Sequence, residues 1–163
     1  MPAKKDPKNW ASLTARDFMQ TTVLTVSTTT PLSEVERLLS EHRISGVPVT
    51  EEAGHIVGVI SIRDLIEHYS EDPASRPGRE GFYNMSSEEL SEEDMDAFEM
   101  PEESQETAGE IMTAQVYTVA AEAGLQEICR KMVKLNIHRI LVEQDRKTVG
   151  LISTMDILKA LAK

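Results

Sequence analysis

The sequence GVISIRD at residues 58–64 returns as GLISTMD at residues 150–156. In each copy an apolar run ends at a serine, and an aspartate stands three positions after that serine. A serine at the N-cap and an acidic residue at N3 form a capping box, so each copy predicts a strand that leads directly into a helix. The chain is therefore expected to build the same local structure twice.

The similarity between the two halves extends well beyond these segments. Residues 14–49 match residues 107–142 at an offset of 93, and after a one-residue deletion the offset becomes 92. The residues of the first half that have identical counterparts are Thr14, Ala15, Met19, Val23, Thr25, Val26, Leu32, Glu34, Arg37, Ile44, Val49, Val57, Gly58, Ile60, Ser61 and Asp64. These identities predict an N-terminal extension (1–13), repeat 1 (14–70), an insert (71–107) and repeat 2 (108–163).

Both repeats show the same order of elements, β-α-β-β-α. In repeat 1 a β-rich run at 23–26 precedes a helix that Thr30 caps, and two further strands are expected at 47–49 and 56–60 before a final helix. In repeat 2 the first strand is expected at 116–119. Since one repeat alone would leave an apolar sheet face open, the predicted fold class is α/β (α+β), with the repeats packed as a pseudo-twofold pair.

The net charge of −11 is concentrated in the insert. Residues 71–107 hold 13 acidic and two basic side chains, and the rest of the chain is neutral. This composition favours a solvated, partly disordered linker. The alternative is a docked helix, with Leu90, Ala97 and Phe98 on one face, that acts as a lid or a dimer contact. The neutral body and acidic insert together disfavour nonspecific binding to nucleic acid.

Several other function classes are disfavoured by the sequence. Cys129 is the single cysteine, which excludes an internal disulfide and a cysteine-based zinc site and fits a reducing compartment. No apolar run approaches the roughly 20 residues of a membrane span, and no secretory signal opens the sequence. Walker, zinc-binding and Ser-His-Asp patterns are not found. We therefore expect a cytoplasmic protein that is not an enzyme and that has no metal site and no membrane contact.

The two Ser-x-x-Asp segments also have a functional interpretation. The N-terminus of a helix presents free N–H groups and the positive end of the helix dipole, both of which attract phosphate. A hydroxyl beside it can donate to a phosphate oxygen, and a carboxylate one turn further on can accept hydrogen bonds from both hydroxyls of a ribose. A capping box needs no ligand, so the structural and the functional interpretation both stay open at this point.

Several motifs, each present twice in register, make the chain resemble a known family. They are residues 15–19, 25–26, 44–49 and 58–64 in repeat 1, and residues 109–113, 118–119, 137–142 and 150–156 in repeat 2. With these motifs the chain closely resembles a pair of CBS domains, known together as a Bateman module. The resemblance implies a regulatory module that binds adenosine-containing ligands in two clefts between the repeats, requires no cofactor, and dimerises into a flat disc of four repeats.

The resemblance also implies which residues contact the ligand, because each cleft of the family mixes the two repeats. Cleft A would take Ser61, Arg63, Asp64, Thr113, Tyr117, Ile137, His138 and Arg139. Cleft B, the weaker one, would take Gln20, Leu24, Ile44, Ser45, Ser153 and Asp156. In cleft A, Asp64 would hold the ribose and Ser61 would touch phosphate. The two arginines and His138 would neutralise phosphate charge, and Tyr117 and Ile137 would contact adenine.

The departures from the family pattern fall mostly on cleft B. Met155 stands where repeat 1 has Arg63, and Ser45 stands where repeat 2 has His138. Repeat 2 also has Leu141 where the family pattern has a proline. Cleft B therefore lacks obvious cations, and we expect a nucleotide to prefer cleft A, since charge-assisted hydrogen bonds are the strong ones.

Two functions are consistent with the resemblance. The first is a stand-alone regulatory CBS pair, a homodimer that senses AMP, ADP or ATP and signals to an effector protein in trans. S-adenosylmethionine and NAD rank behind these ligands. The alternative is a structural dimerisation or scaffold module whose ligand sites are vestigial.

Overall fold

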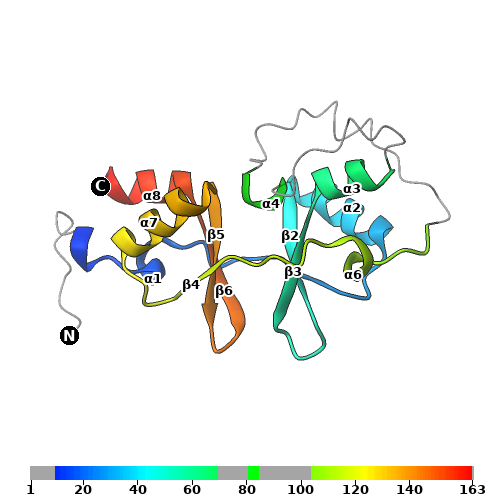
Figure 1. Cartoon of the computed structure of the whole chain (residues 1–163), viewed down its shortest axis with the longest axis horizontal. Coiled ribbons are helices and arrows are strands. Elements are labelled where there is room, and N and C mark those ends of the chain that lie inside the picture. Colours follow the sequence, from blue (N-terminus) through cyan, green and yellow to red (C-terminus); the bar gives the residue numbers. More distant parts are fainter. Residues whose placement is uncertain (1–9, 70–80, 85–103, 163) are drawn as a thin grey trace. The chain divides into compact units, whose positions relative to one another are not determined.

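The computed structural model describes residues 10–69, 81–84 and 104–162 (Figure 1). The chain divides into two compact units. Unit 1 combines the chain up to Val23 with the chain from Tyr117 onward, and unit 2 comprises Leu24–Val116. Each unit has one three-stranded sheet, so each sequence repeat supplies a sheet of its own.

Unit 2 contains the elements expected of repeat 1. They are β1 (Val26–Ser27), α2 (Leu32–His42), β2 (Gly46–Thr50), β3 (Ile56–Ser61) and α3 (Ile62–Tyr69). The strand order is β1-β2-β3, with β1 parallel to β2 and β2 antiparallel to β3. A parallel pair needs a crossover connection, and α2 provides it.

Unit 1 repeats this arrangement with the elements of repeat 2. They are β4 (Thr118–Ala120), α7 (Leu125–Leu135), β5 (Arg139–Gln144), β6 (Lys147–Ser153) and α8 (Thr154–Leu161). Even the irregularities recur, because the register shifts after Val49 in β2 and after Val142 in β5. Both long helices end on a left-handed residue, Arg43 at φ 51° and Asn136 at φ 52°. The β-α-β-β-α repeat and the mixed α/β fold class are thus confirmed.

The core of unit 2 holds the start of α3 in place. Leu32, Val35 and Leu39 lie at helical spacing on α2 and are fully buried. They belong to one cluster with Ile60 of β3 and Leu65 of α3. Burying an aliphatic side chain of this size contributes about 1.5–3 kcal/mol. Because Ile60 and Leu65 are both anchored here, the turn from β3 into α3 between them is held firmly.

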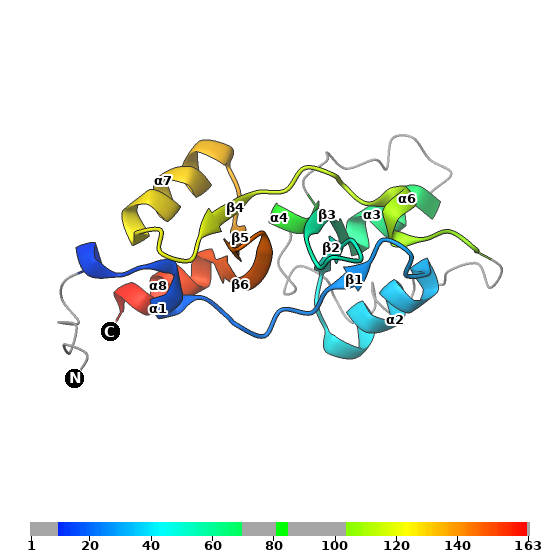
Figure 2. The same ribbon diagram turned by 90° about the horizontal axis from the view of Figure 1, so that it is seen from below.

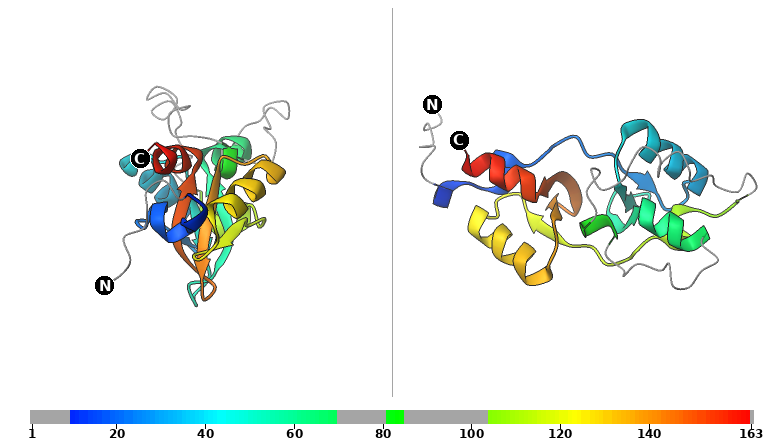
Figure 3. Two further views of the ribbon diagram at one scale, coloured as in Figure 1. Left: turned by 90° about the vertical axis from the view of Figure 1, so that its left-hand side faces the viewer. Right: turned by 90° about the horizontal axis from the view of Figure 1, so that it is seen from above.

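Two short helices each pack in the unit that is built mainly from the other repeat. α1 (Ala15–Phe18) opens repeat 1 but packs in unit 1, where it contacts α8 and β6 (Figures 2 and 3). α6 (Ala108–Ile111) opens repeat 2 but packs in unit 2, against β1, β3 and α3. Each compact unit is therefore completed by the first segment of the other repeat. The boundaries 14–70 and 108–163 describe repeats along the sequence, whereas each compact unit contains residues of both repeats.

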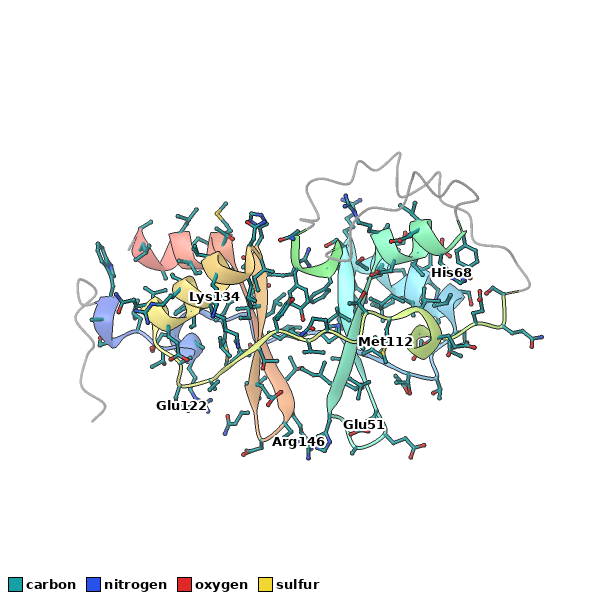
Figure 4. All side chains as sticks on the ribbon, viewed as in Figure 1. Glu51, His68, Met112, Glu122, Lys134 and Arg146 are labelled. Atoms are coloured by element: carbon teal, nitrogen blue, oxygen red, sulfur yellow. The ribbon has the colours of Figure 1, made fainter. Side chains whose placement is uncertain are left out.

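Paired backbone hydrogen bonds fix these exchanged segments. Val59 N donates to Thr113 O at 2.9 Å, and Thr113 N donates to Val59 O at 2.8 Å. In unit 1 the same reciprocal pair joins Gln20 and Leu151, at 2.8 and 2.9 Å. The approach needs the glycine of each motif, because a Cβ on Gly58 would lie 2.5 Å from the sulfur of Met112, which is labelled in Figure 4.

Some predicted element boundaries need correction. The predicted cap of the first long helix was wrong, because α2 begins at Leu32 with Pro31 at its N-cap. The Thr30 hydroxyl instead accepts a hydrogen bond from Ser27 N at 3.0 Å and so shapes the preceding turn. The first strand lies at Val26–Ser27 and not at 23–26, and its counterpart β4 also starts two residues later than predicted. Both are edge strands with a single neighbour, which leaves their ends weakly defined.

Part of the insert belongs to unit 2. α4 (Gly81–Asn84) contacts β2, β3 and α3, with the side chains of Phe82 and Tyr83 buried (Figure 1). Glu106 O accepts a hydrogen bond from Leu32 N at 3.0 Å. The predicted apolar stripe of Leu90, Ala97 and Phe98 lies outside the described residues. Within the part of the chain that is described, no helix is long and apolar enough to cross a membrane.

Candidate functional site

The turn from β3 into α3 forms the predicted capping box. Ser61 N and Ser61 Oγ both donate to Asp64 Oδ2, at 2.7 and 2.6 Å, and Asp64 N donates back to Ser61 Oγ at 3.3 Å. Ser61 is fully buried. The serine hydroxyl is therefore used on both its donor and its acceptor side, and the structural interpretation of the motif is satisfied.

The second carboxylate oxygen of Asp64 is less engaged. Thr113 belongs to repeat 2 but packs in unit 2. Its hydroxyl lies 3.4 Å from Asp64 Oδ1, near the limit for a hydrogen bond. Burial raises the pKa of Asp64, against the lowering effect of its hydrogen bonds to Ser61. Asp64 thus offers an acceptor oxygen at the N-terminus of α3 in a partly desolvated position, where a further hydrogen bond from a ligand hydroxyl would be worth more than in water.

A cation precedes this acceptor in the sequence. Arg63 occupies the second position of α3 and is half-buried, and among the described residues it has no acidic partner. A guanidinium at a helix N-terminus adds positive charge to that of the helix dipole. The start of α3 thus carries an acceptor and a cation, and Thr113 adds a hydroxyl beside the acceptor.

The matching turn in unit 1 carries the second capping box. Ser153 N and Ser153 Oγ donate to Asp156 Oδ2 at 2.8 and 2.7 Å, and Asp156 N donates to Ser153 Oγ at 3.2 Å. The side-chain nitrogen of Gln20 also donates to Asp156 Oδ2, at 2.9 Å. Asp156 is buried, with 9% of its surface exposed, whereas Asp64 is only half-buried. Asp156 is therefore the less accessible acceptor of the two.

The structure divides each predicted cleft between the two units. Of cleft A, the residues in unit 2 are Ser61, Arg63, Asp64 and Thr113, and those in unit 1 are Tyr117, Ile137, His138 and Arg139. Of cleft B, the residues in unit 1 are Gln20, Ser153 and Asp156, and those in unit 2 are Leu24, Ile44 and Ser45. Within unit 2 the first group gathers around one turn, and within unit 1 Gln20 meets Asp156 across 136 positions of sequence.

Most of the remaining predicted residues lie at the entry to the second strand of each sheet, whereas Tyr117 and Leu24 precede the first strands β4 and β1. His138 O accepts hydrogen bonds from Thr154 N at 2.9 Å and from the Thr154 hydroxyl at 3.1 Å, which ties the start of β5 to the start of α8. In unit 2, Ser45 O accepts from Ile62 N at 2.9 Å in the same way. Ile137 and Ser45 are buried. The start of β2 and the start of α3 thus form one corner of unit 2, and the start of β5 and the start of α8 form the matching corner of unit 1.

Sequence reasoning missed α4 as a part of this corner. Gly81 packs directly on the capping box, because a Cβ at Gly81 would lie 2.5 Å from Ser61 Oγ and 3.0 Å from Cβ of Arg63. A signal was present, since Phe82 and Tyr83 are adjacent aromatics in a chain with only 4% aromatic residues and stand in an otherwise acidic insert.

The described residues offer no cluster typical of metal binding. No group of three or more His, Cys, Asp or Glu side chains is placed to hold a metal ion in the part of the chain that is described. Cys129 is half-buried, and burial raises the pKa of its thiol, which disfavours the reactive thiolate. His68 Nε2 contacts the carboxylate of Glu106 at 2.9 Å, and this hydrogen bond joins the end of α3 (Figure 4) to the segment leading into α6.

Comparison with known proteins identifies the fold and the motifs. The CBS domain model matches residues 15–71 and 108–163. The γ subunit of 5′-AMP-activated protein kinase from Dictyostelium discoideum is 30% identical over 147 residues, which cover 86% of this chain but only 22% of the kinase subunit. The chain thus spans about a fifth of that curated relative.

Solved structures agree with this match. The CBS domain of a CBS-domain-containing membrane protein from Sphaerobacter thermophilus superposes with a TM-score of 0.68 at 30% identity, covering 95% of this chain and 91% of that one. CBSX2 in complex with AMP superposes with a TM-score of 0.64 at 21% identity, covering 91% and 96%. The doubled β-α-β-β-α unit, the paired capping boxes and the family match lead to one conclusion: the chain belongs to the CBS-domain family, as a pair of CBS domains.

Proposed function

We propose that this chain senses adenosine-containing nucleotides at the N-termini of α3 and α8 and signals their presence to a partner protein in trans. The observation that carries the proposal is the group formed by Asp64, Arg63 and Thr113. It combines an acceptor for ribose hydroxyls, a positive charge for phosphate and a helix N-terminus in one turn. The AMP complex of CBSX2 and the name of the AMP-activated kinase relative support AMP as the first ligand to test.

The two ends are expected to differ in affinity. Asp64 is the more exposed carboxylate and has Arg63 beside it, whereas Asp156 is 9% exposed, already accepts from Gln20 and has Met155 beside it. A hydrogen bond that involves a charged group is worth roughly 1.5–3 kcal/mol. The loss of one such bond is enough to separate the two sites by about tenfold or more.

The proposal includes a homodimer. Val133 on α7 is 80% exposed, and Met155 and Leu158 on α8 are each 53% exposed. These exposed apolar side chains lie on two helices of one unit, and a second copy of the chain could cover them. Ligand binding would shift the packing of the repeats within that assembly, and an effector would recognise the shift.

Thermal melting with a panel of nucleotides tests the proposal. A ligand that binds the folded state stabilises it by an amount that grows with its concentration over its dissociation constant, about 2.7 kcal/mol at a hundredfold excess. For a chain of this size we expect AMP or ATP to raise the melting temperature by roughly 5–10 °C, with GMP as the control. A melting temperature that no adenine nucleotide raises would favour the alternative, a dimerisation module whose two capping boxes are purely structural.

A further inference from the structure

α4 lies against the corner of unit 2 where β2 begins and β3 ends. Gly46 pairs with Ser61 in the sheet, and α4 packs over both. A Cβ at Gly46 would lie 2.8 Å from Cδ2 of Phe82, and a Cβ at Gly81 would lie 2.5 Å from Ser61 Oγ. Phe82 and Tyr83 are each 3% exposed and meet edge to face, with ring centroids 5.0 Å apart. The contact is thus close, apolar and made at two glycines.

This fit is specific to repeat 1. The position of Gly46 is taken in repeat 2 by Arg139, whose side chain would leave no room for an aromatic ring at that place. Among the described residues, the Phe82 ring therefore has a complementary surface on one of the two repeats only.

The capping boxes of the two repeats provide an internal comparison. Their hydrogen bonds agree within 0.1 Å, since Ser61 Oγ and Ser153 Oγ donate to their aspartates at 2.6 and 2.7 Å. Ser61 is nevertheless fully buried, whereas Ser153 is half-buried. The cap is the same in both, and α4 packs on Ser61, whereas no described element packs on Ser153 in the same way. While Gly81 stays there, no phosphate oxygen can approach Ser61 Oγ.

We propose that α4 competes with nucleotide for the turn from β3 into α3. It covers Ser61 and must leave before a nucleotide can bind at this turn. This inference rests on the proposed function, because it takes the Ser61–Asp64 turn as the nucleotide site. A helix of four residues has no stability of its own, so α4 is held by its contacts with Gly46, Ser61 and Arg63. Docking and ligand binding at the same surface exclude each other, which makes the insert a regulator of affinity.

Docking of α4 lowers the apparent affinity by the fraction of molecules in which the site is open. If about 1–10% of molecules have α4 undocked, removal of the docking contact should tighten nucleotide binding about 10- to 100-fold. The same contact predicts that a saturating nucleotide increases the solvent exposure of residues 81–84.

The variant Gly81→Ala tests the inference. The added Cβ would collide with Ser61 Oγ and Arg63, while the backbone of Gly81 has no positive φ that alanine would strain. Phe82→Ala is a second variant that removes the ring seated on Gly46. Gly124→Ala is the matched glycine control, because the atom nearest to an added Cβ would be Leu13 O at 4.0 Å. Trp10→Ala is the matched aromatic control, because Trp10 is half exposed and lies in unit 1. AMP is titrated calorimetrically into the full-length chain and each variant, and hydrogen exchange of residues 81–84 is followed.

Tighter AMP binding in Gly81→Ala and Phe82→Ala, with both controls unchanged and with faster exchange at 81–84 in the AMP-bound parent, supports the inference. Equal AMP affinity in all chains overturns it and leaves the proposed function standing. Weaker binding in both α4 variants also overturns it, because the aromatic residues would then be part of the binding surface. No AMP binding in any folded chain overturns the proposed function and the inference together.

Discussion

Replacing each capping aspartate by alanine separates the ligand role of the Ser-x-x-Asp turn from its structural role. Asp64 accepts from Ser61 N and Ser61 Oγ, and Asp156 accepts from the two corresponding groups of Ser153. The two boxes therefore make the same hydrogen bonds, and either substitution leaves a backbone N–H at the helix start without its acceptor. The pair forms a matched set within one chain.

The structural cost of the two substitutions should be similar. Loss of a helix cap costs about 0.5–2 kcal/mol, and a buried donor without a partner costs about 1–3 kcal/mol. Asp64→Ala and Asp156→Ala are therefore each expected to lose roughly 1–3 kcal/mol, or a few °C to about 10 °C in melting temperature. Asp156→Ala should sit at the upper end, because Gln20 also loses its partner.

The effect on nucleotide binding should differ. Asp64→Ala is expected to abolish the tighter site, because it removes the acceptor beside Arg63, whereas Asp156→Ala should leave that site nearly intact. Calorimetric titration of AMP and ATP at a temperature well below both melting transitions measures this directly. Equal loss of affinity in the two variants, or tight binding that survives only in Asp64→Ala, would refute the assignment of the site.

Three further predictions concern stability and assembly. Gly58→Ala and Gly150→Ala should each lower the free energy of unfolding by about 1–3 kcal/mol in a denaturant titration, since the added Cβ meets a methionine sulfur at 2.5 Å. Gly124→Ala should lower it less, and equal losses in the three variants would contradict the close approach at Gly58 and Gly150. Light scattering at micromolar concentration should give about twice the chain mass of 18.2 kDa, and a clean monomer would contradict the dimer. Because burial raises the pKa of Asp64, its contribution to stability is greatest at low pH and is lost as the pH rises through the folded pKa. The stability of Asp64→Asn relative to the parent should therefore increase as the pH rises above the ordinary pKa of an aspartate, and a pH-independent difference would count against this.

Local structure was largely predictable from the sequence. The capping boxes at Ser61 and Ser153 form as predicted, because the interactions involved span only three residues. Most of the apolar side chains at helical spacing on α2 and α7 are buried for the same reason, since that spacing is set by the helix itself, whereas Val133 of α7 is exposed. Internal repetition extended this local information to the whole fold.

Long-range pairing was less predictable. α1 and α6 are four-residue helices whose periodicity is too short to say which unit they join, and their placement depends on backbone pairs such as Val59 with Thr113. α4 escaped prediction because acidic composition dominates its surroundings, while its docking depends on space left by Gly46, a feature of tertiary structure. The capping role of Asp64 was predicted from the motif, but the packing of α4 on Ser61 and Arg63 was not.

A crystal structure of the chain grown with AMP tests the central claim most directly. The account predicts that the ribose hydroxyls donate to Asp64, most readily to its Oδ1, that the phosphate lies near Arg63, and that residues 81–84 no longer cover Ser61. AMP bound away from both Asp64 and Asp156, or no bound AMP in crystals grown at millimolar nucleotide, would contradict it.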